Sequence, residues 1–242
     1  MERSVYREMA ELDDRHWWYR ARRDILADLI RREVSLPPKA RILEIGCGTG
    51  HNLEMLARFG KVDALELDDE ARGIAERRLG RKVMSAPLPE LAGVPAHHYD
   101  VIGAFDVIEH IDDDAAALAS IATRLKSGGK FVMAVPAHQW MWTAHDVVNH
   151  HKRRYSKHAL KRLIEASPMK LTKIGYFNSL LFPLAVAERA ASKLRGKEDA
   201  DVRLPPALLN VTFEKVFAAE RYLVGRLPLP PGLSLFAVAE AR

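Results

Sequence analysis

The sequence predicts an α/β fold: a Rossmann-like, mostly parallel sheet of seven strands with helices on both faces. Three observations support this prediction. From residue 39 onward, short apolar segments alternate with segments of helical periodicity. The connections between these segments are short, which favours parallel strands joined by helices. The chain has 242 residues, 48% of them hydrophobic, and is therefore long enough to bury a large core.

The expected strands are short, apolar and bounded by turn residues. They lie at 41–45, 62–67, 81–84, 99–105, 130–135, 171–176 and 233–241. The expected helices carry apolar residues three and four positions apart. They lie at 21–34, 53–59, 69–79, 113–125 and 157–166. The first helix ends before Pro37, since proline cannot continue the helical hydrogen-bond ladder.

Two segments lie outside the regular alternation. Residues 1–38 are polar with interspersed aromatic side chains, and we expect an N-terminal helical segment there. Residues 39–242 form the expected main domain. Within it, residues 178–232 show helical periodicity interrupted by prolines. A connection of this length is usually functional or has its own structure, so we expect a helical cap inserted before the last strand.

The composition narrows the class of protein. Thirty-seven Lys and Arg residues against 32 Asp and Glu residues give a net charge of +5, which permits an anionic partner without requiring one. The single cysteine, Cys47, cannot form an intramolecular disulfide. The longest apolar run, 180–187, is far shorter than the ~20 residues of a membrane span. No apolar signal-peptide core is present near residue 1, so we expect a cytoplasmic protein, either a monomer or a homodimer.

A glycine-rich turn follows the first expected strand. Its glycines are Gly46, Gly48 and Gly50. Their spacing, G-x-G-x-G, differs from the G-x-G-x-x-G fingerprint of dinucleotide-binding proteins. Glu44 just before the turn suits an ammonium group and would sit badly beside a pyrophosphate. Glu66, near the end of the second strand, stands where a carboxylate accepts hydrogen bonds from both ribose hydroxyls. The pattern therefore indicates a nucleoside ligand with a cationic tail.

Over residues 40–135 the chain resembles the class I S-adenosylmethionine-dependent methyltransferases. The resemblance rests on segments 43–50, 63–68, 99–102 and 105–110. It implies S-adenosylmethionine as cofactor and a seven-stranded sheet with an antiparallel last strand. The cofactor-binding residues that it implies are Glu44, Gly46, Cys47, Gly48, Gly50, Glu66, Leu67, Ser85, Ala86 and Asp106. Ser85 departs from the aspartate that the family commonly has beside the adenine.

The segment after strand 130–135 is the densest polar and aromatic stretch of the chain. Together with residues 16–22, it resembles a subgroup of bacterial methyltransferases with HWWYRAR and HD…H-K/R-R-R-Y segments. Candidate catalytic bases are His145, His151 and His110. Candidate acceptor-binding residues are Trp17, Trp18, Trp142, Asp146, Arg153, Arg154 and Tyr155. The alternative is that the tryptophans pack in a core and the basic residues form a solvated helix face.

Several potential metal ligands also lie in this segment. They are His138, His145, Asp146, His150 and His151. Their spacing matches none of the common zinc patterns. From the sequence alone we therefore predict no metal site.

The predicted function is transfer of the methyl group of S-adenosylmethionine to an oxygen or nitrogen of a small or lipid-like metabolite, including anionic ones. Methyl transfer from a sulfonium requires mainly alignment and exclusion of water, and a base only where the acceptor must lose a proton. An apolar cap beside an arginine cluster suits an amphiphilic acceptor, which could be reached by peripheral contact with a membrane.

Two other functions are weighed against this prediction. An NAD(P)-dependent oxidoreductase is disfavoured by the glycine spacing and by Glu44. A non-catalytic S-adenosylmethionine-binding protein would be indicated by a damaged glycine turn, and this turn is intact. No nucleic-acid partner is expected, because the net charge of +5 is modest for phosphate tracking and no Asn-Pro-Pro-Tyr type motif is present.

Overall fold

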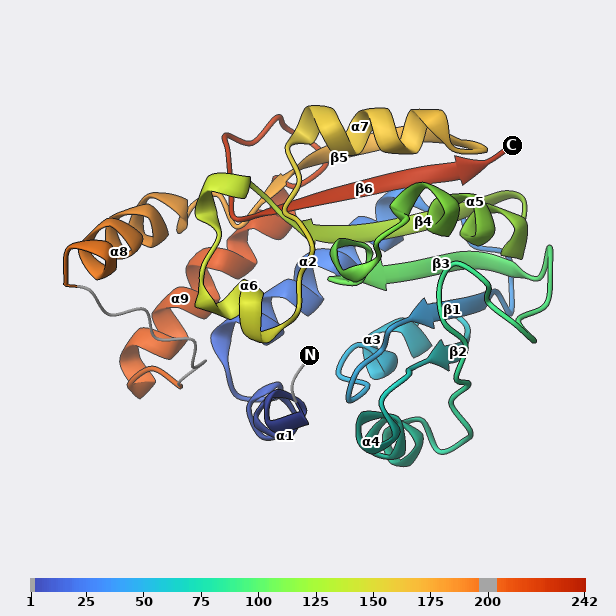
Figure 1. Ribbon diagram of the computed structural model, residues 1–242, viewed down its shortest axis with the longest axis horizontal. Coiled ribbons are helices and arrows are strands. Elements are labelled where there is room, and N and C mark those ends of the chain that lie inside the picture. Colours follow the sequence, from blue (N-terminus) through green and yellow to red (C-terminus); the bar gives the residue numbers. More distant parts are fainter. Residues whose placement is uncertain (1–2, 196–203) are drawn as a thin grey trace.

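A computed structural model gives the fold of the protein and describes residues 3–195 and 204–242 (Figure 1). Residues 1–2 of the expected N-terminal segment and residues 196–203 of the expected cap lie outside the described part. The strands of the central sheet are β1 (Arg41–Ile45), β2 (Lys61–Leu65), β3 (Tyr99–Phe105), β4 (Leu125–Pro136), β5 (Met169–Phe177) and β6 (Ser234–Ala241). The sheet thus occupies the regions in which the sequence predicts strands.

The sheet is mostly parallel, in the order β2-β1-β3-β4-β6-β5. The pairs β1–β2, β1–β3 and β3–β4 are parallel, whereas the last strand, β6, runs antiparallel to both β4 and β5. The predicted mixed α/β architecture with a Rossmann-like sheet is confirmed. The carboxyl ends of β1, β2, β3 and β4 consequently meet at one edge, where α/β proteins bind their ligands.

The predicted number of strands is corrected from seven to six within the described residues. The expected strand at 81–84 forms only an isolated bridge between Met84 and Leu65. The Met84 amide donates to the Ala64 carbonyl at 2.9 Å, and the Met84 carbonyl accepts from the Glu66 amide at 3.0 Å. Only two residues of this segment are apolar, and a proline follows at 87, so it cannot extend the sheet edge further.

Helices cover both faces of the sheet (Figure 1). They are α1 (Arg3–Leu12), α2 (Trp17–Glu33), α3 (Leu53–Ala57), α4 (Asp69–Leu79), α5 (Asp114–Arg124), α6 (Ala144–Val148), α7 (Lys157–Ala166), α8 (Phe182–Arg195) and α9 (Ala207–Ala219). Buried side chains of α5 and α7 pack on one face, and those of α2, α3 and α9 pack on the other. Short 3₁₀ helices span Ile108–His110, Gln139–Met141 and Glu220–Tyr222.

The N-terminal segment is tied to the rest of the chain by charged side chains. Helix α2 begins at Trp17, four residues earlier than predicted, because the His16 ring accepts a hydrogen bond from the Trp18 amide at its N-terminus. Helix α1 contacts α4 through charge pairs. Arg7 of α1 pairs with Glu70 of α4 at 2.6 Å, and Arg78 of α4 donates to the buried Asp13, just after α1, at 2.6 Å. These contacts place α1 beside the carboxyl edge of the sheet.

The two helices in the expected cap region have different surroundings. Helix α9 packs along α2, with the Trp17 ring 5.6 Å from Phe213 and 5.8 Å from Phe217. Phe217 is fully buried, so α9 helps to cover the sheet. Helix α8 extends away from the sheet, and none of its residues from 182 to 192 is buried (Figure 1).

A buried ion pair joins α2 to the end of β3. The Arg22 side chain is 2% exposed, and its guanidinium lies 2.6 Å from the Asp106 carboxylate. The guanidinium also lies over the Trp18 ring, 4.8 Å from its centre. Removing one partner of a buried pair leaves the other charge without compensation, which destabilises a protein far more than loss of an exposed pair does.

We therefore expect Arg22→Met to lower the free energy of unfolding by roughly 3–5 kcal/mol. The matched control is Arg20→Met in the same helix, since Arg20 is half exposed and pairs with Glu214 at the surface. For the control we expect a change of about 1 kcal/mol or less. Urea unfolding followed by circular dichroism measures both values. Equal losses for the two variants would contradict the structural role given to Arg22.

Candidate active site

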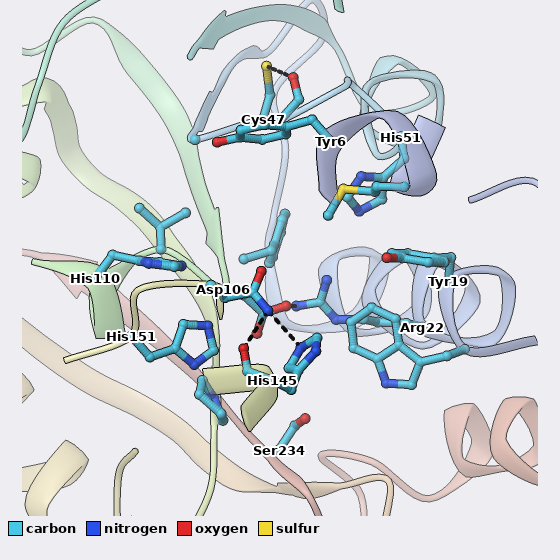
Figure 2. A pocket seen from close by; sticks show the side chains of 18 of the residues that line it. Tyr6, Tyr19, Arg22, Cys47, His51, Asp106, His110, His145, His151 and Ser234 are labelled. Atoms are coloured by element: carbon cyan, nitrogen blue, oxygen red, sulfur yellow. Dashed lines mark hydrogen bonds and ion pairs between the residues drawn. The ribbon is translucent and has the colours of Figure 1, made fainter. Parts of the chain in front are cut away.

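A cavity of about 870 Å³ lies at the carboxyl edge of the sheet (Figure 2). Side chains from α1, α2, the glycine turn, the ends of β3 and β4, the segment around α6, and α8 line it. Its volume is in the range of small-molecule sites. The cavity therefore brings together many of the residues that the sequence predicts for binding the cofactor and for binding the acceptor.

The glycine turn needs glycine for two different reasons. A Cβ added at Gly46, where φ is +65°, would lie 2.7 Å from the Val107 side chain. A Cβ added at Gly48, where φ is +55°, would instead point toward the cavity, with Tyr6 and Met9 about 3.8–3.9 Å away. Gly46 is thus required for packing, whereas Gly48 keeps the cavity open for a ligand beside the backbone.

Glu66 fixes the glycine turn against the end of β2. Its carboxylate accepts hydrogen bonds from the backbone amides of Gly48 at 2.8 Å, Leu67 at 2.8 Å and Asp68 at 2.9 Å. Burial and the nearby Glu66 carboxylate raise the pKa of Tyr6, so its hydroxyl stays protonated and hydrogen-bonds Glu66. Glu66 lines the cavity and retains the acceptor capacity of a carboxylate toward ligand hydroxyls.

Glu44 lies behind the turn and does not line the cavity. Its Oε1 accepts a hydrogen bond from the Asn52 amide group at 2.8 Å, whereas its buried Oε2 has no hydrogen-bond partner among the described residues. Burial raises the pKa of Glu44 to about 8. A buried carboxylate with one unpaired oxygen favours a cation nearby.

The remaining predicted cofactor residues divide into two groups. Cys47, Leu67, Ala86 and Asp106 line the cavity, whereas Gly50 and Ser85 do not. Burial raises the pKa of the Cys47 thiol, so this side chain stays a neutral part of the wall. Leu67 and Ala86, with Leu88, form an apolar surface suited to a flat ring system.

The three predicted catalytic histidines gather on one side of the cavity (Figure 2). The His110 and His151 ring centres are 4.7 Å apart, and those of His145 and His151 are 6.3 Å apart. Burial, followed by the neighbouring His151, lowers the pKa of His110 to about 4. His110 is therefore neutral at pH 7 and can accept a proton or bind a cation.

Asp146 organises the acceptor side without lining the cavity itself. Its fully buried carboxylate accepts hydrogen bonds from His151 Nδ1 at 2.8 Å, from Arg154 Nε at 2.8 Å and from the Thr143 amide at 2.8 Å. Burial opposes ionisation, but the hydrogen bonds from His151 and Arg154 outweigh it and hold the pKa of Asp146 well below its usual range. His151 and Arg154 are thereby held in the cavity wall.

Besides Asp146, three predicted acceptor-binding residues lie outside the cavity lining. Arg153 and Tyr155 both donate hydrogen bonds to Asp114, at 2.9 and 2.7 Å. Trp142 contributes its backbone, whose carbonyl accepts a hydrogen bond from Arg189 at 3.1 Å. Trp17, Trp18 and Arg154 do line the cavity. Of the predicted basic pair 153–154, the structure therefore offers only the second residue to a ligand.

Several cavity residues were missed from the sequence. They are Tyr6, Met9, Tyr19, Arg22, His51, Asn149 and Arg189. Tyr19 and Arg22 belong to the HWWYRAR segment, which was a usable signal. His51 is half-buried at the cavity wall, and desolvation lowers its pKa to about 3, so it is neutral. Met9 and Arg189 belong to no sequence motif. They lie in helices far from the glycine turn in sequence, and only the fold brings them to the cavity.

Comparisons with known proteins agree with this geometry. Residues 17–173 match a family model described as a methyltransferase domain. A ubiquinone biosynthesis O-methyltransferase from Aromatoleum aromaticum is 34% identical over 109 residues, covering 43% of this chain and 46% of that protein. A probable S-adenosylmethionine-dependent methyltransferase from Mycobacterium tuberculosis is 30% identical over 132 residues, covering 54% and 46%. The chain thus spans about half the length of the curated relatives it matches.

Solved structures with a similar fold include a SAM dependent methyltransferase from Archaeoglobus fulgidus, with a TM-score of 0.55 and 17% identity, covering 90% of this chain and 94% of that one. Geranyl diphosphate C-methyltransferase from Streptomyces coelicolor has a TM-score of 0.57 and 14% identity, covering 90% and 75%. At these identities the likeness shows the fold. Because the family model spans more than half of the chain, this protein belongs to the S-adenosylmethionine-dependent methyltransferases.

Proposed function

We propose that the protein transfers the methyl group of S-adenosylmethionine to an oxygen or nitrogen of a small or lipid-like acceptor. The observation that carries the proposal is one cavity lined both by residues of the glycine turn and by His110, His145, His151 and Arg154. Such an arrangement places proton-accepting groups beside the residues proposed to hold the cofactor, within one cavity. The comparisons favour neither of the alternatives, the NAD(P)-dependent oxidoreductase and the non-catalytic binding protein.

The residues around the glycine turn fit the cofactor. Glu66 is placed to accept the ribose hydroxyls, and Gly48 leaves room beside the backbone, whereas Glu44 lies behind the turn and does not contact a ligand in the cavity directly. Leu67 and Ala86 offer an apolar surface to the adenine. When bound, S-adenosylmethionine supplies a methyl group on a positively charged sulfur.

The proposed role of the histidines is to accept the proton that the acceptor loses. His145, His110 and His151 line one cavity, where an imidazole can take up the proton that a hydroxyl or ammonium group loses when the new bond forms. Burial lowers the pKa of His110 to about 4, which makes it a poor base. His151 is oriented by its hydrogen bond to Asp146, whereas His145 contacts Asn149 through its Nε2 at 3.1 Å. We assign His145 as the base because its ring lines the cavity beside His151, 6.3 Å away between ring centres.

Two arginines support an acceptor with an anionic group. Arg154 and Arg189 both line the cavity. Arg154 is paired with Asp146, and Arg189 donates to the carbonyls of Met141 and Trp142. These contacts hold the two guanidinium groups in place at the cavity wall, where a carboxylate or phosphate of the acceptor could reach them.

Exposed apolar side chains support a lipid-like acceptor and peripheral membrane contact. On α9, the Leu208 side chain is 80% exposed, and Leu209 and Val211 are also exposed. On α8, Leu184 is exposed, and the same helix reaches the cavity through Ala185 and Arg189. Among the described helices, none is long and apolar enough to cross a bilayer. We propose contact with the membrane surface, by a monomer or homodimer.

The cofactor assignment predicts that S-adenosylhomocysteine binds with micromolar affinity in a calorimetric titration and that Gly48→Trp abolishes this binding by filling the cavity. The matched control is Gly80→Trp, because Gly80 also has a positive φ, +71°, but ends α4 with open space around it. The control should bind as the unaltered protein does. Binding of NADH in place of S-adenosylhomocysteine would support the oxidoreductase alternative instead.

The assignment of His145 predicts that His145→Gln lowers kcat by roughly 10²–10⁴-fold for a hydroxyl acceptor and leaves S-adenosylhomocysteine affinity unchanged. Formation of S-adenosylhomocysteine is the readout, with acceptors drawn from small phenols, amines and anionic lipids. His158→Gln, at an exposed position of α7, is the control and should keep full activity. Equal rates for the two variants would remove His145 from the mechanism.

The surface assignment predicts that vesicles of phosphatidylcholine and phosphatidylglycerol retain the protein in a flotation assay. The double variant Leu208→Ser/Leu209→Ser should reduce retention, because it removes apolar surface that would enter the interface. Leu227→Ser is the control, since Leu227 is 59% exposed but lies outside both helices. No retention of the unaltered protein would argue against membrane contact.

A further inference from the structure

We propose that Glu109, His110 and His151 form a binding site for a divalent transition-metal ion in the wall of the cavity. Each of the three side chains offers a ligand atom, and these atoms all lie within 4.8 Å of one another. The sequence spacing predicts no such site, because 40 positions separate His110 from His151. Only the meeting of the 3₁₀ helix Ile108–His110 with the segment after α6 brings them together (Figure 2).

The buried Glu109 carboxylate is the strongest evidence for a missing cation. The residue is 0% exposed, and neither carboxylate oxygen has a hydrogen-bond partner within the described part of the chain. Burying a carboxylate without a partner is costly, so buried acidic groups are normally paired, hydrogen-bonded or bound to a metal. Glu109 has no other assigned role in the methyl transfer. A metal ion would explain its position.

The charged groups around Glu109 sum to a negative charge that favours a cation. Three carboxylates are close together here, and two of them already have partners: Asp106 pairs with Arg22 at 2.6 Å, and Asp146 pairs with Arg154 at 2.8 Å. Of these three carboxylates, Glu109 is the one that pairs with no arginine among the described residues. The local charge is therefore one negative unit in excess when all five groups are ionised, and it favours a cation.

His151 is oriented as a metal-binding histidine. Its Nδ1 lies 2.8 Å from Asp146 Oδ1, which leaves Nε2 as the nitrogen available for a metal ion. A carboxylate that receives the second ring N–H of a histidine fixes its tautomer and strengthens it as a ligand. Asp146 is in turn held by Arg154 and the Thr143 amide. The supporting hydrogen bonds of a metal site are thus already formed.

The ligand set selects the class of metal. Two imidazoles and one carboxylate suit Zn²⁺ and its neighbours Mn²⁺, Fe²⁺ and Co²⁺, whereas Mg²⁺ prefers oxygen ligands. In a tetrahedral site with ligand atoms about 2.1 Å from the ion, the ligand atoms are about 3.4 Å apart, so the three side chains need to move closer by up to about 1.4 Å. Three protein ligands leave a coordination position open toward the cavity.

The site would also narrow the acceptor class. A cation in the cavity wall stabilises the deprotonated form of a hydroxyl group that binds to it. This would favour oxygen over nitrogen as the methylated atom and leave His145 to receive the proton. That consequence rests on the proposed function, whereas the metal site itself does not.

The test is a titration of chelator-treated protein with Zn²⁺ alone, followed by calorimetry. We expect one Zn²⁺ per chain with micromolar or tighter affinity. Glu109→Gln and His151→Asn should each weaken binding at least about tenfold, and Asp146→Asn roughly 10–100-fold. The controls Glu165→Gln and His158→Asn, at exposed positions of α7, should bind as the unaltered protein does.

Two further measurements keep the test decisive if a variant fails to fold. Co²⁺ added to the unaltered protein should give the visible absorption bands of a low-symmetry site with imidazole ligands, and Zn²⁺ should raise its Tm. Absence of Zn²⁺ binding, an aquo-ion spectrum with Co²⁺, or unchanged affinity in folded Glu109→Gln would overturn the proposal. S-adenosylhomocysteine binding is measured on the same samples. Its loss with Zn²⁺ binding intact would count against the proposed function alone.

Discussion

The buried charge of Arg22 is the interaction on which the rest of the site depends. Its guanidinium pairs with Asp106 and thereby holds α2 against the carboxyl end of β3. In a poorly solvated interior such a charge acts over several ångströms, and it favours ionisation of the buried Glu44 and Glu109 while opposing protonation of His51. The cofactor side and the acceptor side of the cavity therefore share one electrostatic anchor. This anchor comes from a helix outside the alternating strands and helices.

A second carboxylate, Asp146, likewise holds charged side chains in place, near the three histidines. It takes hydrogen bonds from His151 and Arg154 and so converts a short surface segment into a rigid wall. Burial keeps His110 neutral beside it. Charged groups that would be expensive to bury singly are stabilised here by their partners. The wall therefore combines rigidity with chemical reactivity.

The cofactor half of the site could be predicted from the sequence because its chemistry is local. Gly46, Gly48 and Glu66 lie at the ends of consecutive strands, and parallel pairing brings these ends together. The acceptor half could be predicted only in part. Arg153, Arg154 and Tyr155 are adjacent in sequence, but Arg153 and Tyr155 turn to Asp114 and only Arg154 reaches the cavity. The order of polar residues along the chain does not reveal which of their side chains will pair with a carboxylate in the folded protein and which will line the cavity.

The sequence by itself determined the alternation of strands and helices and the glycine turn, since periodicity and motif spacing are properties of neighbouring residues, and its resemblance to a methyltransferase family indicated the cofactor. The tertiary structure decided that residues 81–84 form a single bridge, that α1 closes over the glycine turn, and that Glu109 meets His110 and His151. Each of these depends on packing between distant segments. The free energy of burying a charge, or of extending a sheet edge, depends on the neighbouring groups that the completed fold supplies.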